Sequence, residues 1–525
     1  PTRLGEAGIA WERALGWLPT FTCTVGALLV RGMLFCPFGR DADMAGAVYT
    51  MSIENRGTVA RTLDLGLEAL PGVLVPRVRT PRPAVGALAA AIDGDLVVLD
   101  PGLVPGLASL ALGADGEADV RLDAAGSARV TRTLVLRPGE RTEVAFYVAA
   151  GPERDGAIAT SAAMRRRGWR WLLAATRDAL ETLQQSTGSE SLDRLVNRNL
   201  LFAYFYGVGR ALDDAHFYLV RSRAPWHPAG VTVRDWDALM MTLPAVQLAD
   251  TGLARELLLR MCELHGYAPG RGVHYFDGTM FEPAYSLDGV ASYAIALERY
   301  IRRTNDDHLI DDPVVGDTLY AVHDELADRR HPELPLYATE VTPSGAVPPH
   351  PYTLHGNAVA AFALEVLRRT LDEETARDVQ EPEAVRAAMD RSFARSEGGK
   401  KLYRTALDLA GGESSEDDPV GAATWLPLYE VVRGDDSTYR RTARALGTSP
   451  SPSLAAMCAR LLGPDRAATL EWLRRAPLDG GVAAQWVDAD GRAVANGGDA
   501  ALAGLLAATV WLAVRPEGET TEDGD

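Results

Sequence analysis

The chain has 525 residues, of which 47% are apolar, enough to bury a large core and to form two domains. Its 53 basic and 71 acidic residues give a net charge of -18, which argues against a nucleic-acid backbone or an anionic membrane as a partner. A neutral ligand is the simpler expectation. The four cysteines lack metal-ligand spacing and are too few to staple a chain of this length, so we expect reduced structural thiols.

The sequence shows no recognisable targeting or membrane-spanning segment. Its apolar runs, such as Ala500 to Val514, contain many small residues and fall short of a membrane span. No basic stretch followed by an apolar one opens the chain, so a cytoplasmic location is expected. Secretion stays open, because the chain begins at Pro1 rather than Met. The sequence indicates no cofactor and no metal site, and it leaves the oligomeric state open.

Residues 1–152 read as an all-β domain, most simply a β-sandwich. Short segments rich in Val, Thr, Leu and Phe alternate apolar and polar residues, and clusters of Gly, Pro, Asn and Asp separate them. The predicted strands are Phe21 to Val30, Ala47 to Asn55, Thr62 to Leu70, Asp95 to Leu99, Ser127 to Leu136 and Thr142 to Ala149.

After residue 152 the spacing of apolar residues becomes that of an α-helix. Residues 153–188 are predicted to form a helical linker, and residues 189–515 a helical domain. Within that domain the clearest charged helices are Leu253 to Leu264, Asp317 to Arg330 and Glu373 to Ser392. Residues 516–525 are polar and acidic, as expected of a disordered tail.

One pattern recurs six times between Ser191 and Trp511: a small polar cluster runs directly into an apolar helical stretch. Repetition of this kind predicts a wheel of inner and outer helices, here an (α/α)6 toroid, in which the inner helices all start at one mouth. The six openings are Ser191-Leu192-Asp193, Arg234-Asp235-Trp236-Asp237, Ser286-Leu287-Asp288-Gly289, Leu354-His355-Gly356-Asn357, Pro419-Val420-Gly421 and Gly497-Gly498-Asp499.

The loops that feed these openings carry the candidate binding residues. Arg234, Asp235 and Trp236, with Trp226 just before them, combine an arginine, a carboxylate and indoles that can grip a sugar by its hydroxyls and its C–H face. An ordinary cap aspartate beside a buried tryptophan is the competing interpretation. In the next loop, three carboxylates accompany several aromatic residues, and these are Asp277, Glu282 and Asp288, of which Asp288 can be only a helix cap.

The third loop contains the candidate proton donor. Glu340 lies among small and apolar neighbours, a setting that raises the pKa of a carboxyl group and suits a general acid. The same loop leads to His355, a further candidate for substrate contact. The sixth loop holds Gln485 and Trp486, and a closed toroid brings it near the first and third loops.

In these openings the chain resembles the (α/α)6-barrel glycoside hydrolases that include glucoamylases and the glucosidase domain of glycogen-debranching enzymes. The resemblance covers roughly Leu192 to Val514 and, less closely, the N-terminal sandwich. Arg234-Asp235 resembles the family's Arg-Asp pair that binds the sugar before the scissile bond. Ser286-Leu287-Asp288 resembles its second block, and Thr339-Glu340-Val341-Thr342-Pro343 resembles the block that holds the general acid.

The sequence departs from the family at the base. An inverting glycosidase needs a second carboxylate about 6.5–9.5 Å from the acid. Gln485 stands at that position, and an amide takes no proton at neutral pH. Three explanations stay open: Asp479, Asp488 or Asp499 is the base; Gln485 is an inactivating replacement of Glu; or the reaction needs no base.

The expected function is therefore an exo-acting, inverting glycoside hydrolase with Glu340 as acid and a group near Gln485 directing water. An inverting phosphorylase is the first alternative, with an anion site among Arg221, Arg223, Arg234, His227 and His355. A non-catalytic sugar-binding homologue is the second. A terpene synthase, using Asp213-Asp214 to bind magnesium and a diphosphate, is a distant third because no second metal-binding box accompanies the pair.

Overall fold

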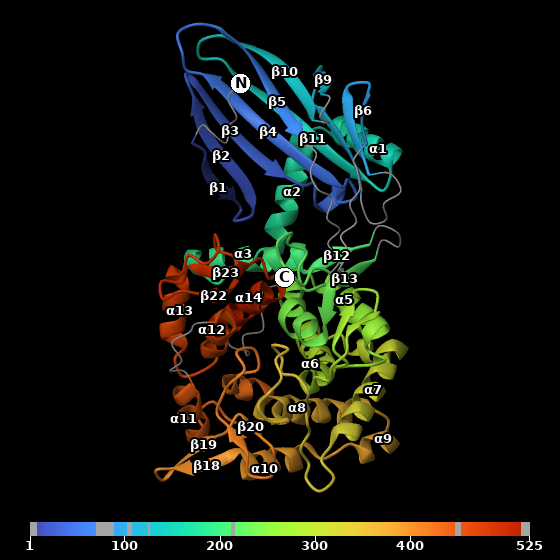
Figure 1. Ribbon diagram of the computed structural model, residues 1–525, viewed down its shortest axis with the longest axis vertical. Coiled ribbons are helices and arrows are strands. Elements are labelled where there is room, and N and C mark those ends of the chain that lie inside the picture. Colours follow the sequence, from blue (N-terminus) through green and yellow to red (C-terminus); the bar gives the residue numbers. More distant parts are fainter. Residues whose placement is uncertain are drawn as a thin grey trace. The chain divides into compact units, whose positions relative to one another are not determined.

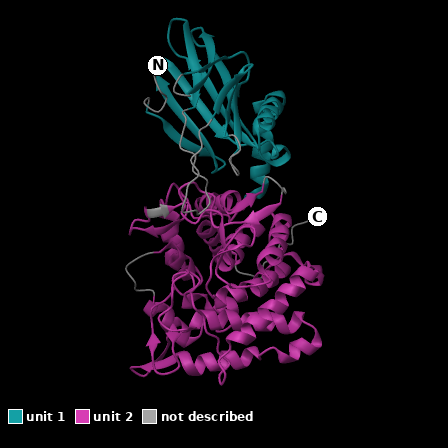
Figure 2. Ribbon diagram, turned by 45° about the vertical axis from the view of Figure 1, so that its right-hand side comes forward, with its two compact units in different colours: residues 1–184 teal, residues 185–525 magenta. Residues whose placement is uncertain are grey.

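The structure is a computed structural model that describes residues 8–69, 89–101, 108–123, 127–211, 216–446 and 453–515. It divides into two compact units, Pro1–Gln184 and Gln185–Asp525 (Figure 2). The expected tail 516–525 and the Asp213-Asp214 pair lie outside the described residues.

Two antiparallel sheets form the first unit (Figure 1). The larger sheet has the order β1-β2-β3-β4-β11-β8-β7-β6 and the smaller one the order β5-β10-β9. Their strands are β1 (Ala10–Ala14), β2 (Leu18–Val25), β3 (Leu28–Phe35), β4 (Gly46–Asn55), β5 (Arg61–Ala69), β6 (Ala89–Asp93), β7 (Leu96–Asp100), β8 (Ser109–Ala114), β9 (Asp119–Leu122), β10 (Ala128–Leu136) and β11 (Arg141–Gly151).

The core of this unit lies between the two sheets. Phe146 of β11 and Ile53 of β4 are buried in one cluster with Val130 of β10, and alternate residues of β10 point into it. This is the packing expected of alternating strands. The sequence predicted most of these strands, but the single strand predicted over Phe21 to Val30 is a hairpin that turns at Gly26, where φ is +58°.

Two helices follow in the segment predicted as a linker, α1 (Arg154–Arg167) and α2 (Trp169–Leu183). Gly168, with φ of +80°, separates them. Helix α1 packs against β7, β8 and β11, so this segment is part of the first unit.

The second unit is mainly helical (Figure 1). Its helices are α3 (Glu190–Tyr206), the π-helical η3 (Asp237–Thr242), α4 (Leu243–Ala249), α5 (Thr251–His265), α6 (Leu287–Thr304), the 3-10 segment η4 (Asp307–Asp311), α7 (Pro313–Arg329), α8 (Leu354–Thr370), α9 (Glu373–Asp378), α10 (Pro382–Phe393), the 3-10 segment η5 (Ala423–Tyr429), α11 (Ser437–Leu446), α12 (Leu454–Leu461), α13 (Arg466–Arg475) and α14 (Ala500–Val514).

Six of the described segments form a closed series of packing contacts. In order, η3 packs against α6, α6 against α8, α8 against η5, η5 against α12, α12 against α14, and α14 against η3. Most residues of these segments are buried, whereas α5, α7 and α13 bury one face each, as amphipathic surface helices do.

The ring corrects one part of the predicted repeat. Each predicted opening lies at or just before a helix, but Ser191 lies in the first turn of α3, which is not a member of the closed series and packs against α14 and α4. The missing ring member is α12, whose cap Ser453 follows residues outside the described part of the chain. A run of Ser, Thr and Pro precedes α12 in the sequence, but it was not among the six predicted openings. The helix predicted over Glu373 to Ser392 is also broken, because Pro382 starts α10.

Short strands hold the loops at the helix starts. They form the sheets β12-β13, β14-β15-β16, β17-β20-β21, β18-β19 and β22-β23. Their bounds are β12 (Val208–Arg210), β13 (Phe217–Leu219), β14 (Thr232–Arg234), β15 (Val273–Tyr275), β16 (Met280–Glu282), β17 (Tyr352–Thr353), β18 (Ala394–Glu397), β19 (Lys400–Tyr403), β20 (Ala406–Leu407), β21 (Glu413–Ser414), β22 (Ala484–Val487) and β23 (Ala493–Gly497). Within the described residues, every helix is too short or too polar to cross a membrane.

Candidate active site

Side-chain caps fix the first turns of the ring helices. Ser286 Oγ accepts the Gly289 N–H at 3.1 Å, and Thr353 Oγ1 accepts the Gly356 N–H at 3.2 Å. Asp499 Oδ1 accepts the Leu502 N–H at 3.1 Å. Because a capped first turn is held rigidly, the residues beside these caps present their side chains in defined positions.

A charge network joins the starts of η3 and α14. Arg221 contacts Asp237 through Nη1 and Asp499 through Nη2, the latter at 2.5 Å. Arg234 Nε lies 3.6 Å from Asp237 Oδ2, and His227 Nε2 lies 3.8 Å from Asp499 Oδ2. We call these five residues the Arg221 network. Its carboxylates are buried, and each lies beside a positively charged or protonatable group.

The charges of the Arg221 network stabilise one another. Burial alone would lower the pKa of Arg221, but Asp237 and Asp499 raise it above its ordinary value. Burial alone would raise the pKa of Asp499, yet Arg221 and His227 hold it well below the usual range. Arg221 and Asp499 therefore stabilise each other's charged form.

Asp235 lies apart from this network. Its carboxyl group is buried and accepts the Gly270 N–H at 2.7 Å and the Tyr293 hydroxyl at 2.9 Å. Burial raises the pKa of Asp235 to about 7. The two bonds tie the start of η3 to α6 and to the loop before it. The predicted contact of Asp235 with a sugar stays a prediction, since the carboxyl group faces protein partners.

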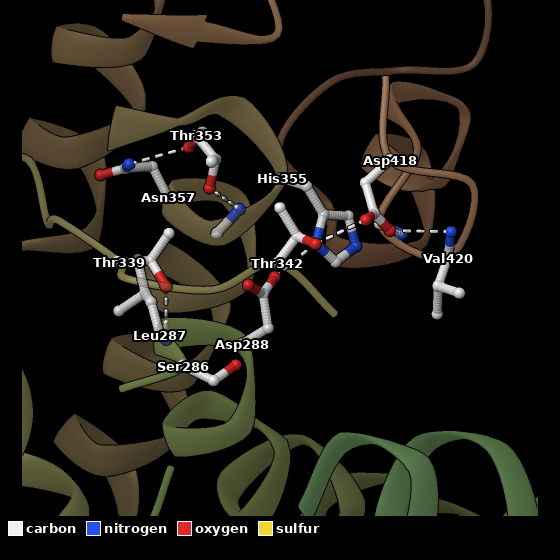
Figure 3. Close-up of polar contacts among 12 residues, drawn as sticks. Ser286, Leu287, Asp288, Thr339, Thr342, Thr353, His355, Asn357, Asp418 and Val420 are labelled. Carbon is white, nitrogen blue, oxygen red and sulfur yellow. Dashed lines mark hydrogen bonds and ion pairs between the residues drawn. The ribbon is translucent and has the colours of Figure 1, made fainter. Parts of the chain in front are cut away.

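A second polar pair joins the starts of α6 and α8. His355 Nδ1 lies 2.5 Å from Asp288 Oδ1, and the two residues are 4% and 0% exposed (Figure 3). The rings of Trp236 and Tyr429 contact His355 edge-on, with centroids 5.2 and 5.4 Å away. The sequence selected Trp236, Asp288 and His355 separately, and the structure brings them into one cluster.

His355 also borders a pocket of about 190 Å³. One wall is the loop from Thr342 to Pro349, and the facing wall is the loop from Glu416 to Gly421. Arg234 Nη1 donates to the Pro343 carbonyl at 3.1 Å and so fixes the first wall. The remaining lining residues are Thr353, Leu354, Thr405, Ala406 and Ala423.

Two adjacent carboxyl groups in this pocket have different surroundings. Asp418 accepts the Thr342 hydroxyl at 2.6 Å, the Ser344 hydroxyl, and the N–H groups of Val420 and Gly421 at 2.9 and 2.8 Å (Figure 3). Within the described part of the chain, the Asp417 carboxyl group accepts the Ala423 N–H alone, at 3.2 Å from each oxygen. Burial raises the pKa of Asp417 to about 8, and the neighbouring Asp418 adds to the shift. Asp417 is therefore protonated at neutral pH.

The predicted acid lies outside the pocket. The Glu340 side chain is 55% exposed, and its Oε1 lies 3.1 Å from Nη1 of Arg329, at the end of α7. It does not line the pocket, whereas Thr342, two residues later, does. Asp277 and Glu282 are exposed in the β15–β16 hairpin, and Asp277 accepts the Thr279 N–H in a local turn. The structure thus separates these three carboxylates from the pocket.

The sixth loop presents its predicted residues to solvent. Gln485 is exposed on β22, and Trp486 beside it is 39% exposed. Trp226 is 62% exposed and donates its indole N–H to the Gly497 carbonyl at 2.8 Å, where β23 ends. These indoles can offer flat faces to a sugar. Their contact with substrate stays a prediction.

Sequence reasoning missed Asp417 and Asp418 and assigned no role to Asp237. The acidic residues precede the fifth predicted opening, Pro419-Val420-Gly421, and that position was the available signal. It was overlooked because a run of Glu and Asp in a loop usually faces solvent. Among the described residues, no group of three or more His, Cys, Asp or Glu side chains is placed to hold a metal ion.

No protein-family model matches the sequence, and no curated protein does. Solved structures match the fold. A bacterial glucoamylase complexed with acarbose aligns with a TM-score of 0.61 and 12% identity, over 97% of this chain and 85% of that one. A human-microbiome protein provisionally assigned as a kojibiose phosphorylase aligns with a TM-score of 0.59 and 12% identity, over 96% and 76%.

A metal-independent alpha mannosidase from Streptococcus pneumoniae, in a non-productive complex with alpha-1,6-mannobiose, also matches. Its TM-score is 0.51 at 13% identity, over 65% of this chain and 97% of that one. The chain therefore has a glucoamylase-like fold, as the resemblance predicted. At these identities the match concerns the fold, and the chemistry has to be argued from the site.

Proposed function

We propose that this chain is a glycoside hydrolase that binds a terminal sugar in the pocket beside His355 and cleaves its glycosidic bond. The observation that carries the proposal is Asp417, a carboxyl group that lines the pocket and holds its proton at neutral pH. A general acid needs a pKa near the working pH so that it is protonated and can still release its proton. The solved structures of similar fold include a glucoamylase and a mannosidase, which supports the same substrate class.

The packing ring supports the (α/α)6 barrel as the scaffold of this site. Five of the six ring segments are followed by a helix that packs against them or their continuation, for example α5 after η3 and α4, and α7 after α6, whereas α14, the last described helix, packs against α3. Five of the six ring segments also begin at or near a predicted polar opening. Such a barrel collects six helix starts at one mouth, where partial positive charges and side chains converge.

Asp417 replaces Glu340 in this proposal as the proton donor. A proton donor must reach the glycosidic oxygen, directly or through one water. Asp417 lines the pocket, whereas the Glu340 side chain faces Arg329. Arg234, which fixes the Thr342 to Pro349 wall, and Trp236, which packs on His355, shape the pocket from behind.

Hydrolysis is favoured over phosphorolysis by the charges around the pocket. Glu416, Asp417 and Asp418 line it, and its described lining contains no lysine or arginine. Phosphate carries negative charge and is normally bound by arginine, lysine or several backbone N–H groups. Water is therefore the better nucleophile here. The small pocket suits one terminal sugar, in line with exo action.

A screen of aryl glycosides and disaccharides, with and without phosphate, tests the proposal. We expect phosphate-independent release of a monosaccharide from at least one glycoside. Asp417→Asn should lower kcat by about 10²- to 10⁴-fold, the range for loss of a general acid. Gln485→Glu, run beside it, tests whether an added carboxylate in the sixth loop raises the rate.

Asp408→Asn is the matched control, because Asp408 is an aspartate in a nearby loop that caps the Ala410 and Gly412 N–H groups and does not line the pocket. Its kcat should stay within about twofold of the parent chain. Binding of sugars without any cleavage would contradict the proposal and favour the non-catalytic homologue. Cleavage that depends on phosphate would favour the phosphorylase.

A further inference from the structure

We propose that His355, held by Asp288, is the general base that activates water in the hydrolysis proposed above. The inference rests on that proposed function. It assigns the general base, which was expected in the sixth loop but is absent from position 485. Gln485 stands where a carboxylate base was expected, and its amide cannot accept a proton at neutral pH.

The contact with Asp288 orients the imidazole. Asp288 is fully buried, and its Oδ1 lies 2.5 Å from His355 Nδ1. In the proposed arrangement Nδ1 donates its hydrogen to the Asp288 carboxylate, which can only accept. In the neutral ring the lone pair is then on Nε2. A buried Asp that orients a catalytic histidine in this way is the arrangement of the serine-protease triad.

Two atoms of the pair have no hydrogen-bond partner among the described residues: His355 Nε2 and Asp288 Oδ2, and both are buried. A buried polar atom without a partner costs about 1–3 kcal/mol. In folded proteins such an atom commonly binds a water molecule, a ligand or a catalytic partner. An Nε2 that must take a proton from a water molecule needs its lone pair free, and the His355 Nε2 meets that need.

Neighbouring side chains hold the His355 imidazole at the pocket. Trp236 and Tyr429 contact it edge-on, each from the start or end of a different helix of the closed series. On the pocket side, Gly421 makes close approach possible, because a Cβ there would lie 3.1 Å from His355 Nδ1 and 2.7 Å from Pro343 Cγ. Glycine at this position therefore lets the two pocket walls close around the imidazole.

The other acceptors of the pocket are less suited to the role. Asp418 already accepts two hydroxyl and two N–H donors. Asp417 holds its proton at neutral pH and serves as the acid. Glu416 is exposed at the rim. Among the buried groups that line the pocket, His355 has a ring nitrogen, Nε2, with no hydrogen-bond partner among the described residues.

The step balances with water as the only co-reactant. The water oxygen forms a bond to the anomeric carbon while the bond from that carbon to the glycosidic oxygen breaks. His355 Nε2 takes the proton that water loses, and Asp417 gives its carboxyl proton to the departing oxygen. The Asp288 carboxylate stabilises the imidazolium that forms. The products are a sugar of inverted configuration and an alcohol, and solvent returns the protons to their starting positions.

Azide rescue of His355→Ala tests the assignment. Azide is a nucleophile that needs no base, so it can replace the activated water. On a glycoside that the parent chain cleaves, His355→Ala should lower kcat by about 10²- to 10⁴-fold, and sodium azide should restore turnover and give a glycosyl azide of inverted configuration. Asp288→Asn should lower kcat more than it changes KM and should move the acidic limb of the pH profile.

His274→Ala is the matched control, since His274 is also buried, its two ring nitrogens have no partner among the described residues, and it does not line the pocket. It should keep its kcat within about threefold of the parent value. If His355→Ala does not fold, His355→Gln fills more of the space and takes its place. Thermal unfolding and sugar binding confirm that each variant is intact.

A folded His355 variant that keeps kcat within threefold would overturn the assignment. So would a variant that binds sugar normally, loses turnover and is not rescued by azide. Either result leaves the proposed function standing if Asp417→Asn still abolishes cleavage. Failure of the parent chain to cleave any glycoside would instead overturn the proposed function, and the base assignment with it.

Discussion

The Arg221 network and the pocket both lie at the starts of the ring helices, yet their charges are matched to different degrees. In the network, Arg221 contacts Asp237 and Asp499 together. In the pocket, Asp417 holds a proton instead of a charge, and His355 Nε2 makes no hydrogen bond to a described residue. The network has the properties of a structural clamp, and the pocket those of a site prepared for proton transfer.

This difference indicates which buried polar groups in such a fold are candidate catalytic residues. Many polar side chains are buried at these helix starts, and some are hydrogen-bonded caps such as Ser286 and Thr353. The informative ones are those whose protonation or bonding is incomplete.

Breaking the clamp should give the largest effect. Arg221→Met keeps much of the side-chain volume but leaves the carboxylates of Asp237 and Asp499 buried without their shared partner. Removing one member of a buried ion network costs about 3–5 kcal/mol. We expect the free energy of unfolding, measured by urea denaturation, to fall by that amount. A loss below about 1 kcal/mol would show that the network is not a clamp.

The pH dependence of the rate tests whether the pocket, unlike the Arg221 network, contains a proton donor. Asp417 must be protonated to act as the acid, and its pKa is raised to about 8 by burial. The value of kcat/KM should therefore fall about tenfold per pH unit above that pKa. Asp417→Asn should remove this basic limb. A limb that persists in the variant would assign the pKa to another group.

A second buried histidine cluster, in which no described carboxylate is hydrogen-bonded to a ring nitrogen, offers a comparison. The rings of His265 and His274 lie 5.2 Å apart, and burial, followed by His274, lowers the pKa of His265 to about 3. In the unfolded chain this pKa is about 6.5, so the unfolded state binds more protons between these values. The contribution of His265 to stability is therefore full above about pH 6.5 and is lost as the pH falls.

Unfolding measured at pH 7 and pH 5.5 checks this effect. We expect the parent chain to lose about 1 kcal/mol over that interval through His265. His265→Gln should lose correspondingly less, since an amide does not titrate. An equal loss in both proteins would show that other groups control the acid response.

The smallest effect is expected at the predicted acid. Glu340 is exposed and pairs with Arg329 at the surface, outside the pocket. Exposed ion pairs contribute little to stability. Glu340→Gln should keep kcat within about twofold on activated and natural glycosides alike. A hundredfold loss on the natural substrate would return the acid role to Glu340.

The sequence was a good guide to elements and a poorer guide to the ring. Hydrophobic periodicity is local, so it predicted α6, α8 and most strands of the first unit. It did not reveal α12, which has only eight residues, although a run of Ser, Thr and Pro precedes it. Nor did it show that α3 lies outside the ring, because a polar start followed by apolar residues looks the same on inner and outer helices.

The sequence indicated where polar side chains gather at the helix starts, but it did not indicate which of them line the pocket. The openings correctly marked where polar groups collect, and they included Trp236, Asp288 and His355. Which side chain faces the pocket depends on packing between distant segments. Arg221 and Asp499 are 278 residues apart, and the Glu340 side chain is drawn away by Arg329 of an outer helix. No local pattern carries that information.

The central claim is that Asp417 protonates the leaving group, and leaving-group dependence tests it most directly. A general acid matters greatly for a poor leaving group and little for a good one. We therefore predict that Asp417→Asn lowers kcat/KM by at least about 100-fold on an alkyl glycoside and by less than about tenfold on the dinitrophenyl glycoside of the same sugar. Equal losses on both substrates, or no loss on either, would contradict the account.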